Sequence, residues 1–111
     1  MSVTPKTITS AQVAATATTY YTAPANTRSI IKKLTFTNST AGALTVTVYL
    51  VPLGGTAGVT NILISARSVG AGETYECFEA MGQVLQAGGF IQALASSATS
   101  ITIQGSVAEV V

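Results

Sequence analysis

Histidine, aspartate and tryptophan are absent from this chain of 111 residues, and cysteine occurs once. Histidine is the commonest general base and a frequent metal ligand, so its absence removes the usual nucleophilic and metal sites. The remaining carboxylates are Glu73, Glu76, Glu79 and Glu109. The first three lie three residues apart, a spacing that sends consecutive side chains to opposite faces of a strand. We therefore expect no enzyme activity, no metal site and no cofactor.

Charged residues are also scarce, at 8% of the chain against about 25% in an average soluble protein. The net charge of +1 is too small for binding to a phosphate backbone. Lys32 and Lys33 are adjacent, and strand alternation predicts that they point to opposite faces. An exterior with so little charge is typical of surfaces that contact protein. The alternative is an ordinary small β domain with threonine on its solvent face.

The single Cys77 cannot form an intramolecular disulfide. We expect a packed thiol, with a bridge between subunits as the alternative. No basic segment followed by an apolar core opens the sequence, and no apolar run approaches the roughly 18 residues that span a membrane. These patterns predict a protein that is made in the cytoplasm and does not associate with membranes.

Residues 43–51 give the clearest structural signal in the chain. Apolar and polar side chains alternate there, with Leu44, Val46, Val48 and Leu50 on one side and Thr45, Thr47 and Tyr49 on the other. Turn-forming residues bound the segment at 38–42 and at 52–58, where three glycines occur. The pattern predicts a β-strand with one buried face, and Val46 and Val48 as core residues.

Similar alternation predicts further strands over residues 12–22, 29–38, 61–66, 73–78, 90–95 and 101–107. In residues 29–38, Ile30, Leu34 and Phe36 share a face, and the short connection to 43–51 predicts an antiparallel hairpin between the two strands. Gly105 marks a close approach of another chain segment. Residues 79–87 read as a loop with at most one helical turn.

The regular spacing of short strands predicts an all-β chain, a single antiparallel β-sandwich or jelly-roll-like domain of seven to eight strands. The chain lacks crossover connections of a dozen or more residues, which argues against parallel pairing. Residues 1–10 are too poor in apolar side chains to anchor a core, so we expect an N-terminal arm or edge strand. Residues 11–111 then form the β-sandwich domain.

The four tyrosines could form a sugar-stacking platform, although in a domain without tryptophan they are more often packing residues or interface anchors. Tyr49 falls on the outward side of its strand, and a glycine-rich loop follows it. We therefore choose as candidate interface residues Tyr20, Tyr49, Pro52, Leu53, Gly54, Gly55 and Thr56.

Three stretches, residues 21–33, 38–57 and 85–95, together resemble small β-sandwich proteins from the virions of tailed bacteriophages. The resemblance extends over roughly residues 18–108. Gly88-Gly89 departs from it, because Gly-Asp is expected before the strand at that place. The resemblance implies a capsid decoration (cement) protein or a module of tails and fibres, and it supplies no catalytic residues.

The resulting expectation is a non-enzymatic virion structural protein, assembled in the host cytoplasm, that stabilises a head shell by bridging capsid subunits. Its partners would be the major capsid protein or other virion proteins and further copies of itself, as a trimer or dimer. The alternative is a tail or fibre component, or a module that binds a glycan or receptor.

Overall fold

The computed structural model describes residues 2–111, apart from the side chain of Thr9. Its nine strands and one 3-10 turn are β1 (Val3–Gln12), β2 (Thr18–Thr22), β3 (Arg28–Asn38), β4 (Leu44–Val51), β5 (Ile62–Val69), β6 (Thr74–Glu76), η1 (Phe78–Ala80), β7 (Val84–Leu85), β8 (Phe90–Ala95) and β9 (Ile101–Val110). The two-residue β7 raises the count above the predicted seven to eight strands. It lies in the segment that we expected to be a loop.

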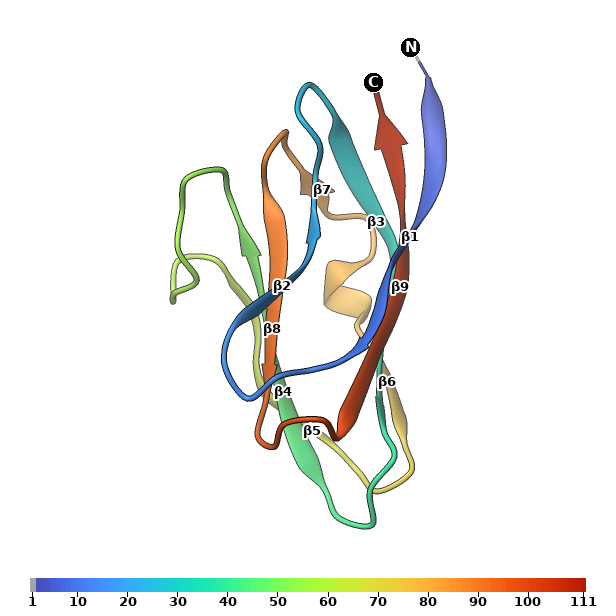
Figure 1. Ribbon diagram of the computed structural model, residues 1–111, viewed down its shortest axis with the longest axis vertical. Helices are drawn as coiled ribbons and strands as arrows, with labels where there is room; N and C mark the ends of the chain where they lie inside the picture. The colour runs from blue at the N-terminus through green and yellow to red at the C-terminus, as the bar shows by residue number, and fades with distance from the viewer. Residues whose placement is uncertain (1) are drawn as a thin grey trace.

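The strands form two antiparallel sheets that face each other (Figure 1). Sheet A has the order β1-β9-β3-β6, with β7 also paired to β3, and sheet B has the order β2-β8-β4-β5. The pairs β1–β9, β2–β8, β3–β6 and β4–β5 are nested, because the second half of the chain runs back along the first. The predicted antiparallel sandwich is confirmed.

The core lies between the sheets and follows the two-residue repeat of the strands. Val46 and Val48 are fully buried, as predicted, and their register partners on β8, Ala95 and Ala93, are buried beside them. Phe36 is the largest fully buried side chain that sheet A contributes. Burial of these apolar side chains is worth about 25 cal/mol per Å² removed from water, which makes this face the main source of stability.

Two strand predictions were wrong. The strand expected over residues 12–22 covers only Thr18–Thr22, because the chain passes from sheet A to sheet B before it. The hairpin expected between residues 29–38 and 43–51 does not form, since β3 belongs to sheet A and β4 to sheet B.

Asn38 explains why the connection after β3 crosses between the sheets. Its side chain is fully buried, and its amide nitrogen donates to the carbonyl oxygens of Gly42 (2.8 Å) and Val69 (2.9 Å). Its amide oxygen accepts from the backbone N–H of Thr40 (2.9 Å). The Asn38 side chain thus forms hydrogen bonds both within its own loop and with β5 of the other sheet. These bonds stabilise a connection that crosses between the sheets, whereas a hairpin would need a tight turn within one sheet.

A β-bulge in β3 changes the predicted faces of that strand. Its register with β9 shifts between Ile31 and Lys33, so Ile31 is fully buried and Ile30 only half-buried. Lys32 and Lys33 are both exposed. The extra residue of a bulge turns two successive side chains to the same side, which corrects the expectation that these lysines point to opposite faces.

Gly105 on β9 lies beside this bulge. A Cβ atom at Gly105 would overlap the carbonyl oxygen of Lys33 and come within 3.1 Å of Ile8. The predicted close approach is confirmed, and the approaching segment is the bulged backbone of β3.

η1 lies between the sheets and contacts β3 and β5 (Figure 1). Ala80 and the preceding Cys77 are buried in the core, in agreement with the predicted packed thiol. With three residues, η1 is the one helical segment of residues 2–111, and no described helix is long and apolar enough to cross a membrane.

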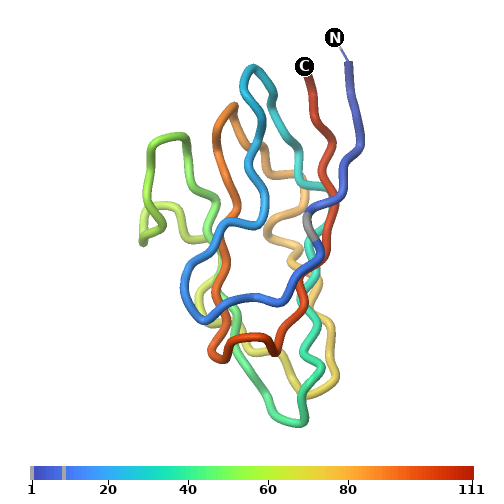
Figure 2. Tube along the Cα trace, in the orientation of Figure 1, coloured from blue at the N-terminus to red at the C-terminus, as the bar shows by residue number. Residues whose placement is uncertain are grey.

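The molecule is elongated, with extents of 46 × 25 × 20 Å. The ends of the chain lie together at one tip, near the connection between β2 and β3, while residues 39–43 turn at the opposite tip (Figure 2). The loop between β4 and β5 projects beside sheet B, green in the figure.

Candidate functional site

The outer face of sheet B carries Tyr49 at its centre. In register with Tyr49 are Gln92 on β8 and Ile62 on β5, and Leu94 and Phe90 occupy the next outward positions along β8. All five are half-buried and lie outside the core cluster. The face is therefore a surface of aromatic, aliphatic and amide groups that water reaches only in part.

This face is almost free of charge. Of the five cationic and four anionic side chains, only Arg67 belongs to a strand of sheet B. Its guanidinium lies 4.5 Å from the centre of the Tyr75 ring on β6, at the edge where the two sheets meet. Depletion of charge and enrichment in aromatic side chains are the features that distinguish the cores of protein interfaces.

The loop after β4 extends this surface. Leu53 is 75% exposed and Val59 90% exposed. The loop is held by a turn in which the Gly55 N–H donates to the Pro52 carbonyl oxygen (2.9 Å), with Gly54 at a φ of +77° that favours glycine. Thr56 is exposed. Residues 52–56 are the loop positions predicted from sequence, whereas Val59 was not among them, and all of them follow Tyr49 along the chain.

Tyr20 lies apart from that surface. It packs against the core, and its hydroxyl accepts the backbone N–H of Ala14 (2.8 Å). This bond anchors the passage from β1 to β2, so Tyr20 has a structural contact that its sequence position did not reveal.

The tyrosines do not gather into a platform. Tyr49 and Tyr21 belong to sheet B and Tyr75 to sheet A. The Tyr21 hydroxyl donates to the Glu109 carboxylate (2.5 Å) and lies 2.7 Å from the Ser29 hydroxyl, both on sheet A. Burial, followed by the hydrogen bond to Glu109, raises the pKa of Tyr21 to about 12.

Tyr75 makes the equivalent link at the other edge of the sandwich. Besides the Arg67 guanidinium, it contacts Glu79, to which its hydroxyl donates. Burial, and then this bond, raises the pKa of Tyr75 to about 12, while the same bond lowers the pKa of the Glu79 carboxyl. Tyr21 and Tyr75 thus tie the two sheets together and are not placed to stack on a common ligand.

β1 is the edge strand of sheet A. Ser2 and Val111 exchange both backbone hydrogen bonds, so by alternation the peptide groups of Val3, Pro5 and Thr7 face away from β9. Pro5 has no N–H to offer there. β1 also supplies the fully buried Ile8 to the core, and it continues to Gln12, past the expected boundary between residues 10 and 11.

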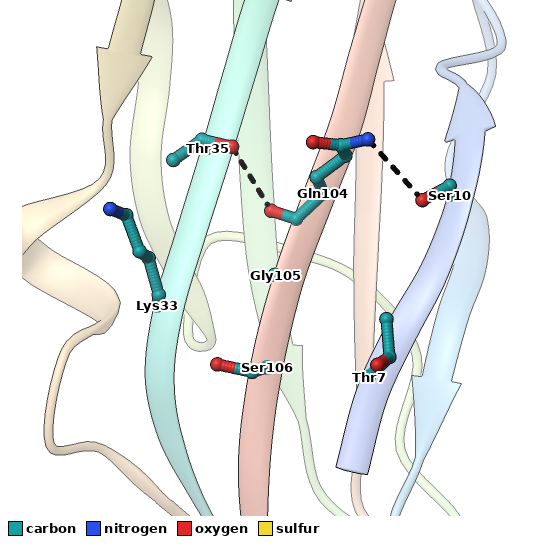
Figure 3. Close-up of a pocket in the computed structure, with 7 residues that line it drawn as sticks. All are labelled: Thr7, Ser10, Lys33, Thr35, Gln104, Gly105 and Ser106. Carbon is teal, nitrogen blue, oxygen red and sulfur yellow. Dashed lines mark hydrogen bonds between the residues drawn. The ribbon is translucent and has the colours of Figure 1, made fainter.

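The outer face of sheet A changes character along its length. Near the chain termini, the residues in register across it are apolar: Pro5, Ala108, Ile30 and Val84. Arg28 borders them. Beyond the bulge the face is polar, and a shallow hollow of about 460 Å³ lies there (Figure 3). It is lined by Thr7 and Ser10 from β1, Gln104, Gly105 and Ser106 from β9, and Lys33 and Thr35 from β3.

Sequence reasoning did not find this hollow, since its polar residues lie far apart in the chain and follow no motif. Gly105 was the one signal of it. The structure also gathers no group of three or more potential metal-ligating side chains among the residues that it describes. Burial raises the pKa of the Cys77 thiol to about 11, which makes it a poor nucleophile.

No protein-family model and no curated protein matches this chain. Solved structures of infectious bursal disease virus do share its fold. A mutant VP2 protein in derived T=1 particles is 19% identical, over 96% of this chain and 31% of that chain, with a TM-score of 0.53. A chain of the viral particle is 18% identical, over 96% of this chain and 30% of that chain, with a TM-score of 0.52. A chain from the Gx strain is 22% identical, over 98% of this chain and 33% of that chain, with a TM-score of 0.50.

The chain thus spans about a third of the length of these viral chains. At such low identity, the likeness concerns the fold. It relates the sandwich to a domain-sized part of proteins from virus particles, and these proteins come from a virus other than the tailed bacteriophages that the sequence resembles.

Proposed function

We propose that this chain is a non-enzymatic structural protein of a virus particle, a capsid decoration (cement) protein of a tailed bacteriophage. The observation that carries the proposal is the uncharged outer face of sheet B, continued by the loop at residues 52–56, on a sandwich whose fold recurs in chains of a virus particle. The nested strand pairs support a jelly-roll arrangement, which is common to capsid and lectin domains.

The mechanism is burial of surface. Sheet B is four strands wide, and β4, one of its two inner strands, has eight residues. At about 4.8 Å between strands and 3.4 Å per residue, this gives a flat area of roughly 500 Å². The adjoining loop brings the surface towards the roughly 800 Å² per partner of a stable interface. The same surface can hold neighbouring capsid subunits together or join copies of this chain as a dimer or trimer.

The first experiment compares particles with and without the protein. Particles that lack it should assemble and then break at a lower temperature, and purified protein should restore their resistance without any cofactor. A copy number in the hundreds per particle, measured against the major capsid protein, supports a capsid location. A few dozen copies, or intact particles that fail to attach to cells, would support the tail, fibre or glycan-binding alternative.

A matched pair of isosteric variants tests which surface binds. Gln92→Glu places a charge at the centre of the sheet B face, whereas Gln12→Glu places the same charge at an exposed position on β1. We expect Gln92→Glu to lower particle binding about tenfold or more, since a charge buried at an interface without a partner costs at least 1–3 kcal/mol. Equal binding by both variants would contradict the proposed surface.

A further inference from the structure

The polar hollow on sheet A is a built feature of the fold. β9 passes beneath it, and the strands on both sides of β9 are bulged at that level: β1 between Ile8 and Ala11, and β3 between Ile31 and Lys33. Gly105 lies between the two bulges, where a side chain would overlap the β3 backbone. Paired bulges bend a sheet locally and re-aim side chains, and they are common beside binding sites.

The β3 bulge determines which side chain reaches the hollow. It directs Lys33 outward into register with Ser106, which in turn is in register with Thr7 on β1. The three residues are therefore in register across three strands, and the Lys33 side chain extends from the rim of the hollow towards Glu76 on β6 (Figure 3). The backbones that carry these residues are separated by the strand spacing of about 4.8 Å.

The hydroxyl groups of this row are available to a ligand. Thr7 and Ser106 make no side-chain hydrogen bond to any residue that the structure describes, whereas Thr35 donates to the Gln104 carbonyl oxygen (3.3 Å) and the Gln104 amide donates to Ser10 (3.5 Å). Each free hydroxyl can donate one hydrogen bond and accept two. The hollow thus offers hydrogen-bond donors and acceptors to a polyhydroxyl compound.

One charge decides the class of that compound. Lys33 lies at the rim, and its ammonium is 3.7 Å from the Glu76 carboxylate, with both side chains about half exposed. Glu76 would repel a dianionic phosphate more strongly than a singly charged ligand. The site therefore fits a ligand carboxylate that shares the Lys33 ammonium with Glu76. Charge-assisted bonds of this kind are about twice as strong as neutral ones.

We propose that this hollow binds a carboxylate-bearing sugar, such as a uronic acid unit of a polysaccharide. The carboxylate pairs with Lys33, and the ring hydroxyls bond to Ser106 and Thr7. The volume of about 460 Å³ lies within the range of small-molecule sites, about 300–1,000 Å³. The site is on the face opposite to the contact surface of sheet B, so a bound particle leaves it open.

The test is a titration of the full chain with sodium glucuronate, followed by the backbone amide NMR shifts. We expect millimolar binding with the largest shifts at Thr7, Lys33 and Ser106. Glucose and acetate, which carry only the hydroxyls or only the carboxylate, should each bind at least about tenfold more weakly, since each loses one class of contact. Equal binding of either compound, or no shifts at about 100 mM glucuronate, would overturn the proposal.

Three variants assign the binding to the hollow. Lys33→Met should weaken glucuronate binding about tenfold. Lys32→Met removes the same charge from the neighbouring residue of the bulge, which does not line the hollow, and should change binding less than about twofold. Glu76→Gln should tighten binding about threefold, because Lys33 no longer shares its charge.

A general loss of structure cannot produce effects of opposite sign, so this pattern is specific to a carboxylate site. Equal loss in Lys32→Met and Lys33→Met would overturn the proposal in favour of diffuse charge attraction. The titration needs no virus particle, and its outcome is therefore separate from that of the particle-binding experiments.

Discussion

The outer faces of the two sheets are built from similar strands and yet differ in chemistry. Sheet A carries Lys33 and Glu76 beside a hollow lined with hydroxyls. Sheet B presents Tyr49 among amide and aliphatic groups, with its single charged side chain turned to the edge. The two proposals divide along this difference: the sheet B face is proposed to bind protein by contact, and the sheet A hollow to bind a polar ligand.

The edges of the sheets point to association through a face. Pro5 removes a donor from the free edge of β1. β2 is five residues long with an irregular register, and β5 shifts register twice against β4. Strand addition needs a regular row of free N–H and C=O groups. Because these edges lack one, they support the proposed contact through the outer face of sheet B.

The largest expected effect separates the inner face of sheet B from its outer face. Val48→Asp places a carboxylate in the fully buried core, at a cost of about 5 kcal/mol or more, which is comparable to the whole stability of a small domain. We expect no cooperative unfolding transition by circular dichroism. Tyr49→Asp, one residue along, should leave a folded protein that has lost its particle binding. Unfolding of both variants would mean that sheet B is buried on both faces.

The next effect tests the floor of the sheet A hollow. Gly105→Ala forces a methyl group against the Lys33 carbonyl oxygen and Ile8, and we expect it to lower the free energy of unfolding by about 2–4 kcal/mol in urea titrations. Gly42→Ala is the matched control, since a Cβ there meets no atom within 4 Å and its φ is not positive. Equal stability of the two variants would contradict the close packing between β9 and the bulge.

The sequence predicted the buried face of sheet B and failed at the features that break alternation. Val46 and Val48 follow a strict two-residue repeat, so their burial could be read directly. The β3 bulge reverses that repeat at Ile31, and no residue type marks it, because either of two lysines could be the extra residue. The polar row of the hollow unites Thr7, Ser106 and Lys33 from three strands, and only the sheet order brings them together.

The third effect concerns the polar ties between the sheets. The pKa values of Tyr21 and Tyr75 are raised from 10.0 to about 12 in the folded chain. A raised pKa means that the folded state favours the neutral phenol, so this stabilisation is complete below pH 10 and is lost as the pH rises from 10 to 12. The Cys77 thiol, raised from 9.0 to about 11, acts in the same direction. Melting temperatures should therefore fall between pH 9 and 12, with the Cys77 contribution lost first.

A pair of variants assigns part of that alkaline loss to Tyr21. Tyr21→Phe leaves Glu109 and Ser29 without its hydroxyl and should cost about 1–3 kcal/mol at neutral pH while reducing the fall above pH 10. Tyr49→Phe should change neither quantity, because the Tyr49 hydroxyl has no hydrogen-bond partner among the described residues. An unaltered alkaline slope in Tyr21→Phe would show that the tie between the sheets does not depend on this phenol.

The smallest effect has the opposite sign and lies at the edge of sheet B. Ala66 adopts a φ of +47° in the bulge where β5 passes Thr47, whose hydroxyl accepts the Ala66 N–H (2.9 Å). A left-handed backbone costs a residue with a Cβ about 1–2 kcal/mol, and glycine avoids this cost. Part of the gain is cancelled because glycine loses more chain entropy on folding. We expect Ala66→Gly to raise the free energy of unfolding by about 0.5–1 kcal/mol. Ser65→Gly, in the same strand without a positive φ, should lower it by about as much. If both glycines destabilise the protein, the backbone of the bulge is not strained. The irregular edge of sheet B would then hinder strand addition without costing the fold any stability.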